Sequence, residues 1–312
     1  MSEKKKYPRY YSNGKLLISG EYAVTDGALA LALPVKYGQS LEIDTNCNSD
    51  TLRWEAYVKN KLWFFVDYNI ENLSIIKTNI TSAAEKLIHV LKAIIEADPE
   101  FKQKLKSKII THTNFNKEWG LGTSSTLLSN IAFWAKTNPY NLLNKTSNGS
   151  GYDIAAARET KPFLYRIEGN KKHTIETVNF AENLKDNLFF VYLGKKQNSE
   201  DSLNNYKKRN KVTSKIIDEI SEISRYLAYS DDLEIFNKAL FNHEEIISSL
   251  IGTKPIQQEF FNDFEGQTKS LGAWGGDFIL ASSNKGLDYV TDYFNNQNLK
   301  TIFNYNDIII KP

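Results

Sequence analysis

Several residue types and patterns are nearly or wholly missing from this sequence. Cys47 is the only cysteine among 312 residues, which excludes an intrachain disulfide and a metal site built from several cysteines. A single cysteine also fits a reducing compartment, so we expect a cytoplasmic setting. No apolar run is long enough to span a bilayer. No apolar segment follows the polar residues 1–6 either, so we expect no signal peptide.

The chain also lacks an excess of either charge. It carries 39 Lys and Arg residues against 37 Asp and Glu residues, a formal net charge of +2. This balance argues against a nucleic-acid-binding surface spread over the protein, and the basic run at residues 4–6 is typical of a solvated terminus. Hydrophobic residues make up 41% of the chain, which is enough for a well-buried core. We therefore expect a globular protein that binds neither nucleic acid nor membrane.

The order of the predicted elements indicates an α+β fold. No repeat at solenoid spacing and no Pro/Ser-rich linker is present. Strands come first in a block and longer helices come later, which differs from a regular β–α alternation. We place a domain boundary near residue 180, between regions 1–180 and 181–312. Strands are predicted over 10–19, 37–44, 51–58, 62–68, 107–112, 163–166, 174–178, 188–193, 278–282 and 307–311, and helices over 83–97, 127–135, 212–228, 233–250, 256–270 and 287–295.

The strongest local signal is a glycine-rich turn, Gly120–Ser125, directly before an apolar helix. Gly120 and Gly122 allow positive φ angles and close approach of a ligand. The next three residues place hydroxyl and N–H groups at a helix start, where the helix dipole favours phosphate oxygens. The turn matches neither the Walker pattern G-x-x-x-x-G-K-[ST] nor the dinucleotide pattern G-x-G-x-x-G. Taken alone, it is equally compatible with an ordinary Ser/Thr helix cap.

Three separated segments together resemble the GHMP kinases, the superfamily of galactokinase, homoserine kinase, mevalonate kinase and phosphomevalonate kinase. Gly14–Val24 is similar to the first motif of that superfamily, Gly120–Ser125 to the second, which is its ATP phosphate loop, and Gly272–Asp277 to the third. Their order is that of the family, and they span nearly the whole chain. The resemblance implies a two-lobed fold, with a β-rich N-terminal lobe, a ferredoxin-like C-terminal lobe and an active site in the cleft between them.

Two more segments extend the resemblance. Gly149–Ala156 lies where mevalonate and phosphomevalonate kinases carry their catalytic Asp, and Gly194–Ser199 is similar to a segment of these kinases that faces the phosphates. The resemblance implies that Asp153 orients the acceptor hydroxyl or accepts its proton. Lys15 is the expected partner that keeps this carboxylate ionised and stabilises the transition state.

The resemblance also assigns the remaining site residues. Mg²⁺ and ATP are the expected cofactors, with the Ser125 hydroxyl near the metal. The predicted ATP contacts come from Gly120, Leu121, Gly122, Thr123, Ser124 and Ser125, and the predicted acceptor contacts from Glu21, Lys195, Lys196, Ser199 and Arg158. Each charged residue among the acceptor contacts has a solvated or structural role as its alternative, and Glu21 in particular is a candidate for holding the first motif in place.

The sequence departs from the family pattern at one functional point. Mevalonate kinases carry an acidic Mg²⁺ ligand before the catalytic Asp, whereas residues 141–146 contain no acid. Asn144, Asp153 or ATP itself would then hold the metal. Trp274 and Asp277 in the third motif also differ from the small residues common there, and an Asp after the glycines is similar to the phosphomevalonate kinases.

We therefore expect an enzyme that uses ATP to phosphorylate a small-molecule alcohol or phosphate. The first candidate is a mevalonate-pathway kinase of isoprenoid biosynthesis, acting on phosphomevalonate or mevalonate. The alternatives are a kinase for a sugar or a homoserine-type acceptor and, because the acid is missing, a catalytically silent ligand sensor. A homodimer is left open.

Overall fold

The protein is an α+β protein, as predicted. The computed structural model describes residues 7–45, 50–147, 149–169, 172–195, 197, 199–209 and 212–311. Within these residues, one sheet has eight strands and a second sheet has four. The chain divides into two compact units. Unit 1 comprises the residues up to Gly14, Tyr37–Lys117 and Gly122–Arg158, and unit 2 comprises Lys15–Lys36, Glu118–Leu121 and the residues from Glu159 onward.

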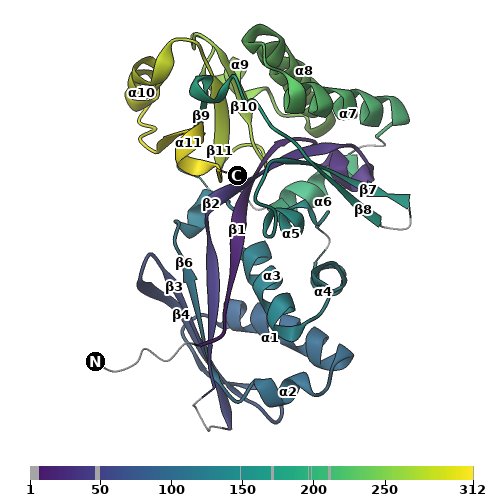
Figure 1. Cartoon of the computed structure of the whole chain (residues 1–312), viewed down its shortest axis with the longest axis vertical. Coiled ribbons are helices and arrows are strands. Elements are labelled where there is room, and N and C mark those ends of the chain that lie inside the picture. The colour runs from purple at the N-terminus through teal and green to yellow at the C-terminus, as the bar shows by residue number, and fades with distance from the viewer. Residues whose placement is uncertain are drawn as a thin grey trace. The chain divides into compact units, whose positions relative to one another are not determined.

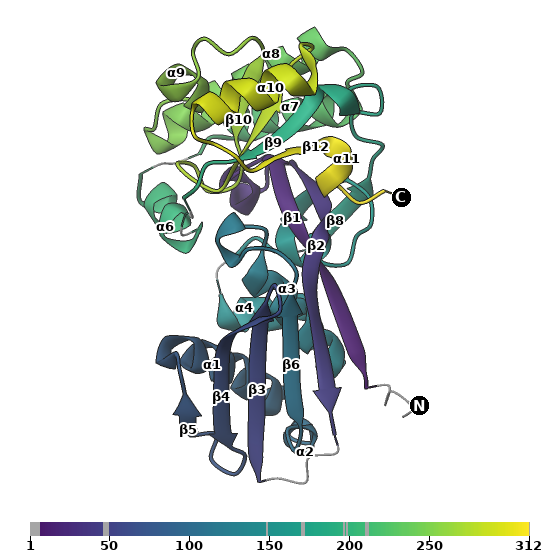
Figure 2. The same ribbon diagram turned by 90° about the vertical axis from the view of Figure 1, so that its left-hand side faces the viewer.

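Unit 1 is a sheet with helices on one face. Strands β1 and β2 contribute residues to both units. Its elements are β1 (Arg9–Ser19), β2 (Ala30–Asp44), β3 (Thr51–Val58), β4 (Lys61–Asn69), β5 (Ile75–Thr78), β6 (Lys108–Thr113), α1 (Thr81–Ala97), α2 (Phe101–Lys104), α3 (Thr123–Ala135), α4 (Pro139–Thr146) and α5 (Tyr152–Ala156). The strand order here is β5-β4-β3-β6-β2, and only β3 and β6 are parallel. Helices α1, α3 and α4 all lie on the same face of this sheet (Figures 1 and 2).

The core of unit 1 lies between that sheet face and the helices. The apolar residues of α1 recur at helical spacing, so that Leu87, Leu91 and Ile94 fall on one buried face. They pack in one cluster with Trp54 of β3 and Trp134 of α3. Burial of this stripe explains why helices form here, since isolated helices of this length are only marginally stable.

Unit 2 contains the four-stranded sheet and most of the long helices. Its elements are β7 (Phe163–Glu168), β8 (Lys172–Thr177), β9 (Leu188–Tyr192), α6 (Ser199–Arg209), α7 (Ser214–Tyr229), α8 (Leu233–Ile251), α9 (Ile256–Phe260), β10 (Gln267–Ser270), β11 (Phe278–Ser282), α10 (Gly286–Asn296), β12 (Ile302–Asn304) and α11 (Tyr305–Ile308), with 3₁₀ turns η1 (Ala23–Asp26), η2 (Lys117–Trp119, shared with unit 1) and η4 (Lys185–Asn187). The small sheet has the order β10-β11-β9-β12 and is antiparallel throughout.

The small sheet follows the predicted ferredoxin-like pattern. Its elements run strand, helices, strand, strand, helix, strand along the chain, which is the β-α-β-β-α-β succession of that fold. Figure 2 shows α10 lying across this sheet. Buried residues of β9 and β11 pack against Val290 and Phe294 of α10. In the same unit, β7 pairs with Ala30–Ala32 of β2 and with β8.

Two predicted elements were wrong. The helix predicted over 256–270 ends at Phe260, and residues 267–270 form strand β10, because they pair along β11. The strand predicted over 307–311 does not form, because helix α11, capped by the Asn304 side chain, includes its first two residues, and Ile309 makes only a single bridge to Val35.

Other elements differ in extent. Strand β2 begins at Ala30, seven residues before its predicted start, because its first residues pair with β7. Helices α4 and α6 were not predicted. The two compact units interleave along the sequence, because β1 and β2 each contribute residues to both. The predicted boundary near residue 180 between two lobes stays a prediction. No helix in the described ranges is long and apolar enough to cross a membrane.

The core of unit 2 yields a stability prediction. Phe190 is fully buried in the centre of β9, whereas Phe260 is 58% exposed. Because Phe190→Ala leaves a cavity, we expect it to lower the free energy of unfolding by about 3–5 kcal/mol. Phe260→Ala makes the same chemical change at the surface, and we expect a change within about 0.5 kcal/mol. Urea unfolding followed by circular dichroism measures both, and equal effects would contradict the assigned core.

Candidate active site

The first motif and the start of the phosphate loop are bonded to each other in unit 2. The Lys15 side chain donates from Nζ to the Gly120 carbonyl at 2.7 Å. The Lys15 backbone N–H donates to the Leu121 carbonyl at 3.0 Å. The segment around Lys15 therefore runs beside the loop, and the ammonium group of Lys15 fixes the loop's first glycine.

The third motif packs against the same glycine, Gly120. Asp277 is 7% exposed, and a Cβ atom added to Gly120 would lie 2.4 Å from its carboxyl carbon. Gly120 has a φ of +66°, so both its backbone conformation and the space it leaves require glycine. The Asp277 carboxyl group thus packs directly against the phosphate loop.

The backbone around Asp277 holds that carboxyl group in place. Its φ is +55°, which is uncommon for a residue other than glycine. Its N–H donates to the Lys195 carbonyl at 2.6 Å, and its carbonyl accepts from the Leu193 N–H at 2.8 Å. The Gln197 N–H donates to Oδ1 at 3.3 Å. Lys195 and Gln197, which belong to the segment Gly194–Ser199 identified from the family resemblance, therefore bond to Asp277 of the third motif.

The rest of the phosphate loop belongs to unit 1 and begins helix α3. Gly122 has a φ of 92° and occupies the N-cap position. The first turn of an α-helix leaves N–H groups without carbonyl partners inside the helix, and here they belong to Thr123, Ser124 and Ser125. Such N–H groups, together with the positive end of the helix dipole, suit phosphate oxygens.

The two serines of the loop differ in exposure. Ser124 is exposed, whereas Ser125 is 5% exposed and donates its hydroxyl proton to the Gly122 carbonyl at 2.9 Å. Ser125 keeps its oxygen lone pairs for a metal ion, but Ser124 is the more accessible hydroxyl. The predicted metal contact at Ser125 stays a prediction, with Ser124 as an equal candidate.

Helix α3 itself is anchored by buried polar side chains of unit 1. Thr126 donates to the Gln39 side chain at 3.2 Å. Asn130 donates to the Gln39 carbonyl at 2.8 Å and accepts from the Ser12 hydroxyl at 2.8 Å. Because buried polar groups bond in specific geometries, these contacts fix the position of α3 on β1 and β2.

Asp153 lies in the short helix α5, which packs against α3 in unit 1. Gly151 precedes the helix with a φ of 88°. The Asp153 side chain is half-buried, and its Oδ1 accepts the Ile154 N–H at 3.0 Å. The carboxylate is thus oriented by its own backbone. Asp153 belongs to unit 1 and Lys15 to unit 2, so their predicted pairing stays a prediction.

Glu21 is buried rather than exposed to a ligand. Its side chain is 1% exposed and forms an ion pair with Lys269, which is 0% exposed. Burial raises the pKa of Glu21 to about 7, and the neighbouring Lys269 charge opposes that rise. Of the two roles considered for Glu21, this environment favours the structural one over the predicted acceptor contact.

Arg158 is likewise engaged by its own unit. Its guanidinium donates to the Ser129 hydroxyl at 2.9 Å, to the Ser129 carbonyl at 3.0 Å and to the Tyr11 carbonyl at 3.0 Å. It also stacks over the Phe133 ring at 3.4 Å, and burial lowers its pKa to about 10. These contacts favour a structural role over the predicted acceptor contact.

The remaining predicted contacts cluster after β9. Lys195 is exposed, and its backbone carbonyl binds Asp277 as described. Lys196 lies outside the residues that the structure describes, and so does the side chain of Ser199.

The acidic and imidazole side chains of the described residues bear on how the predicted Mg²⁺ would be held. Among the described residues, no group of three His, Cys, Asp or Glu side chains could hold a metal ion. A magnesium ion commonly binds one or two carboxylates together with substrate phosphates. The ATP and Mg²⁺ contacts named from the sequence stay predictions.

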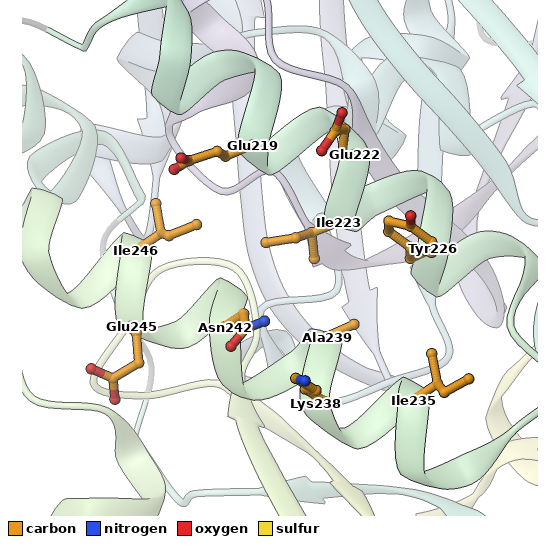
Figure 3. Close-up of a pocket in the computed structure, with 10 residues that line it drawn as sticks. All are labelled: Glu219, Glu222, Ile223, Tyr226, Ile235, Lys238, Ala239, Asn242, Glu245 and Ile246. Atoms are coloured by element: carbon orange, nitrogen blue, oxygen red, sulfur yellow. The ribbon is translucent and has the colours of Figure 1, made fainter.

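A groove of unit 2 is lined by other residues. It measures about 590 Å³ and lies between α7 and α8 (Figure 3). Apolar side chains such as Ile223 and Ile235 line it together with Glu219, Glu222 and Glu245. None of its ten lining residues is one of the predicted site residues, so we do not assign the site to this groove.

Sequence reasoning missed Lys269, His243 and the role of Tyr22. Lys269 was missed because it falls inside a predicted helix. Its position three residues before the glycine cluster at Gly272 could have marked it as a candidate. The Tyr22 hydroxyl accepts the Trp274 backbone N–H at 3.3 Å, a contact between residues 252 positions apart that no local pattern indicates.

The packing at Gly120 yields a prediction with an internal control. Gly194 has a similar φ of +77°, but a Cβ atom added there would have no other atom within 4 Å. Gly120→Ala and Gly194→Ala therefore share the conformational cost, about 1–2 kcal/mol, and only the former clashes with Asp277. We expect Gly120→Ala to lower the free energy of unfolding by about 1–3 kcal/mol more.

Urea unfolding measures this difference. The double variant Gly120→Ala/Asp277→Gly removes the clashing carboxyl group and suits the positive φ at 277, so we expect it to recover most of the loss. Equal destabilisation by Gly120→Ala and Gly194→Ala would show that Asp277 does not pack on Gly120.

No family model matches the chain, and no curated protein matches it by sequence. Solved structures match it along nearly its whole length. Methanococcus jannaschii mevalonate kinase has a TM-score of 0.69 at 17% identity and covers 99% of this chain and 100% of its own.

Two further matches differ in substrate. Streptococcus pneumoniae phosphomevalonate kinase, in complex with phosphomevalonate and AMPPNP, has a TM-score of 0.68 at 16% identity, covering 95% of this chain and 99% of its own. Lactococcus lactis galactokinase, complexed with galactose, has a TM-score of 0.64 at 10% identity, covering 98% and 94%. All three are GHMP kinases, and at 10–17% identity the likeness shows the fold. The chain therefore has the fold of the GHMP kinases, as its three motifs predicted.

Proposed function

We propose that this protein is an ATP-dependent kinase of a small-molecule acceptor. The observation that carries the proposal is the meeting of three sequence-distant motifs at one glycine. Lys15 of the first motif donates to Gly120, and Asp277 of the third motif packs against it. Gly120 opens the loop that leads into α3. A cation beside a loop that leads into a helix start is an arrangement that suits a bound anion.

The chemistry of phosphoryl transfer assigns the roles. Catalysis there is mostly positioning and stabilisation of charge on the transferred group. Under the proposal, the N–H groups of Thr123–Ser125 bind phosphate oxygens and Lys15 contributes positive charge. Asp153 orients the acceptor hydroxyl and accepts its proton. A bound Mg²⁺ would neutralise phosphate charge, with the hydroxyl of Ser124 or Ser125 as its protein ligand.

For the acceptor we propose mevalonate or phosphomevalonate. Two of the structural neighbours are mevalonate and phosphomevalonate kinases, and Asp277 follows the third glycine cluster as in phosphomevalonate kinases. A phosphorylated acceptor needs additional cations. Because Arg158 is engaged by Ser129 and Tyr11, it no longer favours phosphomevalonate over mevalonate. The proposal also includes a cytoplasmic location for the protein and leaves open whether it forms a homodimer.

A substrate panel tests this function. ADP release is coupled to an optical readout with Mg²⁺, ATP and each of mevalonate, phosphomevalonate, homoserine and galactose. We expect turnover with one of the first two. Turnover with homoserine or galactose alone would replace the acceptor but keep the kinase. ATP binding without turnover on any acceptor would favour the ligand sensor.

The role of Asp153 yields a second prediction. The amide oxygen of Asp153→Asn can still accept the Ile154 N–H, so the substitution removes the charge and leaves the local hydrogen bond. We expect kcat to fall by about 10²–10⁴-fold, with the KM for ATP nearly unchanged.

A matched control exists in the same unit. Asp98 also accepts a backbone N–H close by in sequence, that of Glu100 at 3.1 Å, but lies at the end of α1. Asp98→Asn should leave kcat unchanged. A kcat for Asp153→Asn close to that of the unmodified protein would contradict the role assigned to Asp153.

A further inference from the structure

A cluster of buried ionisable side chains lies next to the first motif in unit 2. Glu21, Lys269, His243 and Glu244 are each no more than 1% exposed. The Lys269 ammonium donates to Glu21 Oε1 and to the Ser270 carbonyl. Buried charges in a protein are costly unless they are paired, so this arrangement needs a reason.

The hydrogen bonds of the cluster specify one arrangement. His243 Nε2 accepts the Gly20 N–H at 2.9 Å, which requires a neutral ring on that side. Burial and the Lys269 charge lower its pKa well below the usual range. Glu244 accepts the backbone N–H groups of Ser270 at 2.7 Å and Ile256 at 3.0 Å. The acceptor for the Lys269 charge is therefore Glu21, while Glu244 binds backbone.

A buried ion pair of this kind is weak evidence for stability. Apolar residues of similar volume would serve as well or better, because taking two charges out of water costs several kcal/mol per ion. What an ion pair adds is a defined distance and direction between two groups. We therefore ask which parts of the chain Glu21 and Lys269 connect.

The pair connects the first motif to the third. Glu21 lies six residues after Lys15, directly beyond strand β1, and Lys269 lies in β10, three residues before Gly272. A second contact runs alongside, from the Trp274 backbone N–H to the Tyr22 hydroxyl. Glu21 and Tyr22 of the first motif thus contact Lys269, just before the third motif, and Trp274 within it.

We propose that the Glu21–Lys269 ion pair is a positioning element that sets the third glycine motif against the first, so that Asp277 and Lys15 meet at Gly120. Under this proposal, neither residue contacts the acceptor or ATP. The inference rests on the proposed function for its kinetic consequence, but its structural consequence is independent of any activity.

The structural arm measures hydrogen exchange by mass spectrometry. Three amides report the arrangement: Lys15 donates to Leu121, Leu271 to Phe278 and Asp277 to Lys195. In Glu21→Gln and in Lys269→Met, we expect exchange at these amides to rise about tenfold or more. The central strand β11, fully buried, serves as the internal reference and should stay protected.

The control pair has the same residue types. Lys285 and Glu265 form an ion pair in the same unit at 2.7 Å, with side chains 48% and 59% exposed. Lys285→Met and Glu265→Gln should leave exchange at the three amides unchanged. Unchanged exchange in Glu21→Gln and Lys269→Met as well would overturn the inference, whatever the enzyme assay gives.

The kinetic arm separates positioning from stability. We expect each single variant to lose kcat by on the order of 10²-fold, the loss that a displacement of about 1 Å produces. The double variant Glu21→Gln/Lys269→Met removes both charges of the pair, so it should regain most of the unfolding midpoint but not kcat. Lys269→Arg, which keeps the charge, should recover part of kcat.

The outcomes are distinguishable. A double variant that regains both stability and kcat would overturn the positioning role. Because the double variant is expected to fold, it also tests this role if a single variant does not fold. If no acceptor is turned over, the proposed function fails while the exchange measurement still decides the inference.

Discussion

The arrangement around Gly120 is the constraint on which the candidate site depends. A cation from β1 and a carboxyl group from the turn before β11 both contact this residue. No other amino acid fits, because a Cβ atom would overlap Asp277. The positive φ of Gly120 directs the chain toward Gly122 and the start of α3. One residue without a side chain therefore allows three distant segments to approach closely.

Buried polar groups complete this arrangement in each unit. In unit 2, the Glu21–Lys269 pair and the Tyr22 hydroxyl connect the first and third motifs. In unit 1, Gln39 and Asn130 anchor the helix that the phosphate loop begins. Apolar packing stabilises both units but tolerates small shifts, whereas hydrogen bonds between buried groups define distances. The site thus depends on polar contacts, while the fold depends on the apolar cores.

Sequence patterns predicted much of the fold because most elements bury one regular face. The strand over 51–58 and the strand over 278–282 have the predicted bounds, since their β-branched and aromatic residues pack on a sheet. The helix predicted over 256–270 failed because its last residues pair with β11, and strand pairing between distant segments overrides local propensity. The three motifs likewise predicted the fold family.

The sequence by itself identified the candidate residues of the site, whose roles stay predictions: Lys15, the glycines of the loop, Asp153 and the third glycine cluster. Only the tertiary structure decided what several charged residues do. Glu21 and Arg158 are charged residues in or near predicted motifs, as ligand-binding residues would be. In the structure, Glu21 is buried against Lys269 and Arg158 is stacked on Phe133. The physical reason is that a side chain's charge is fixed by its chemistry, whereas its partners and its access to solvent are fixed by segments distant in the chain.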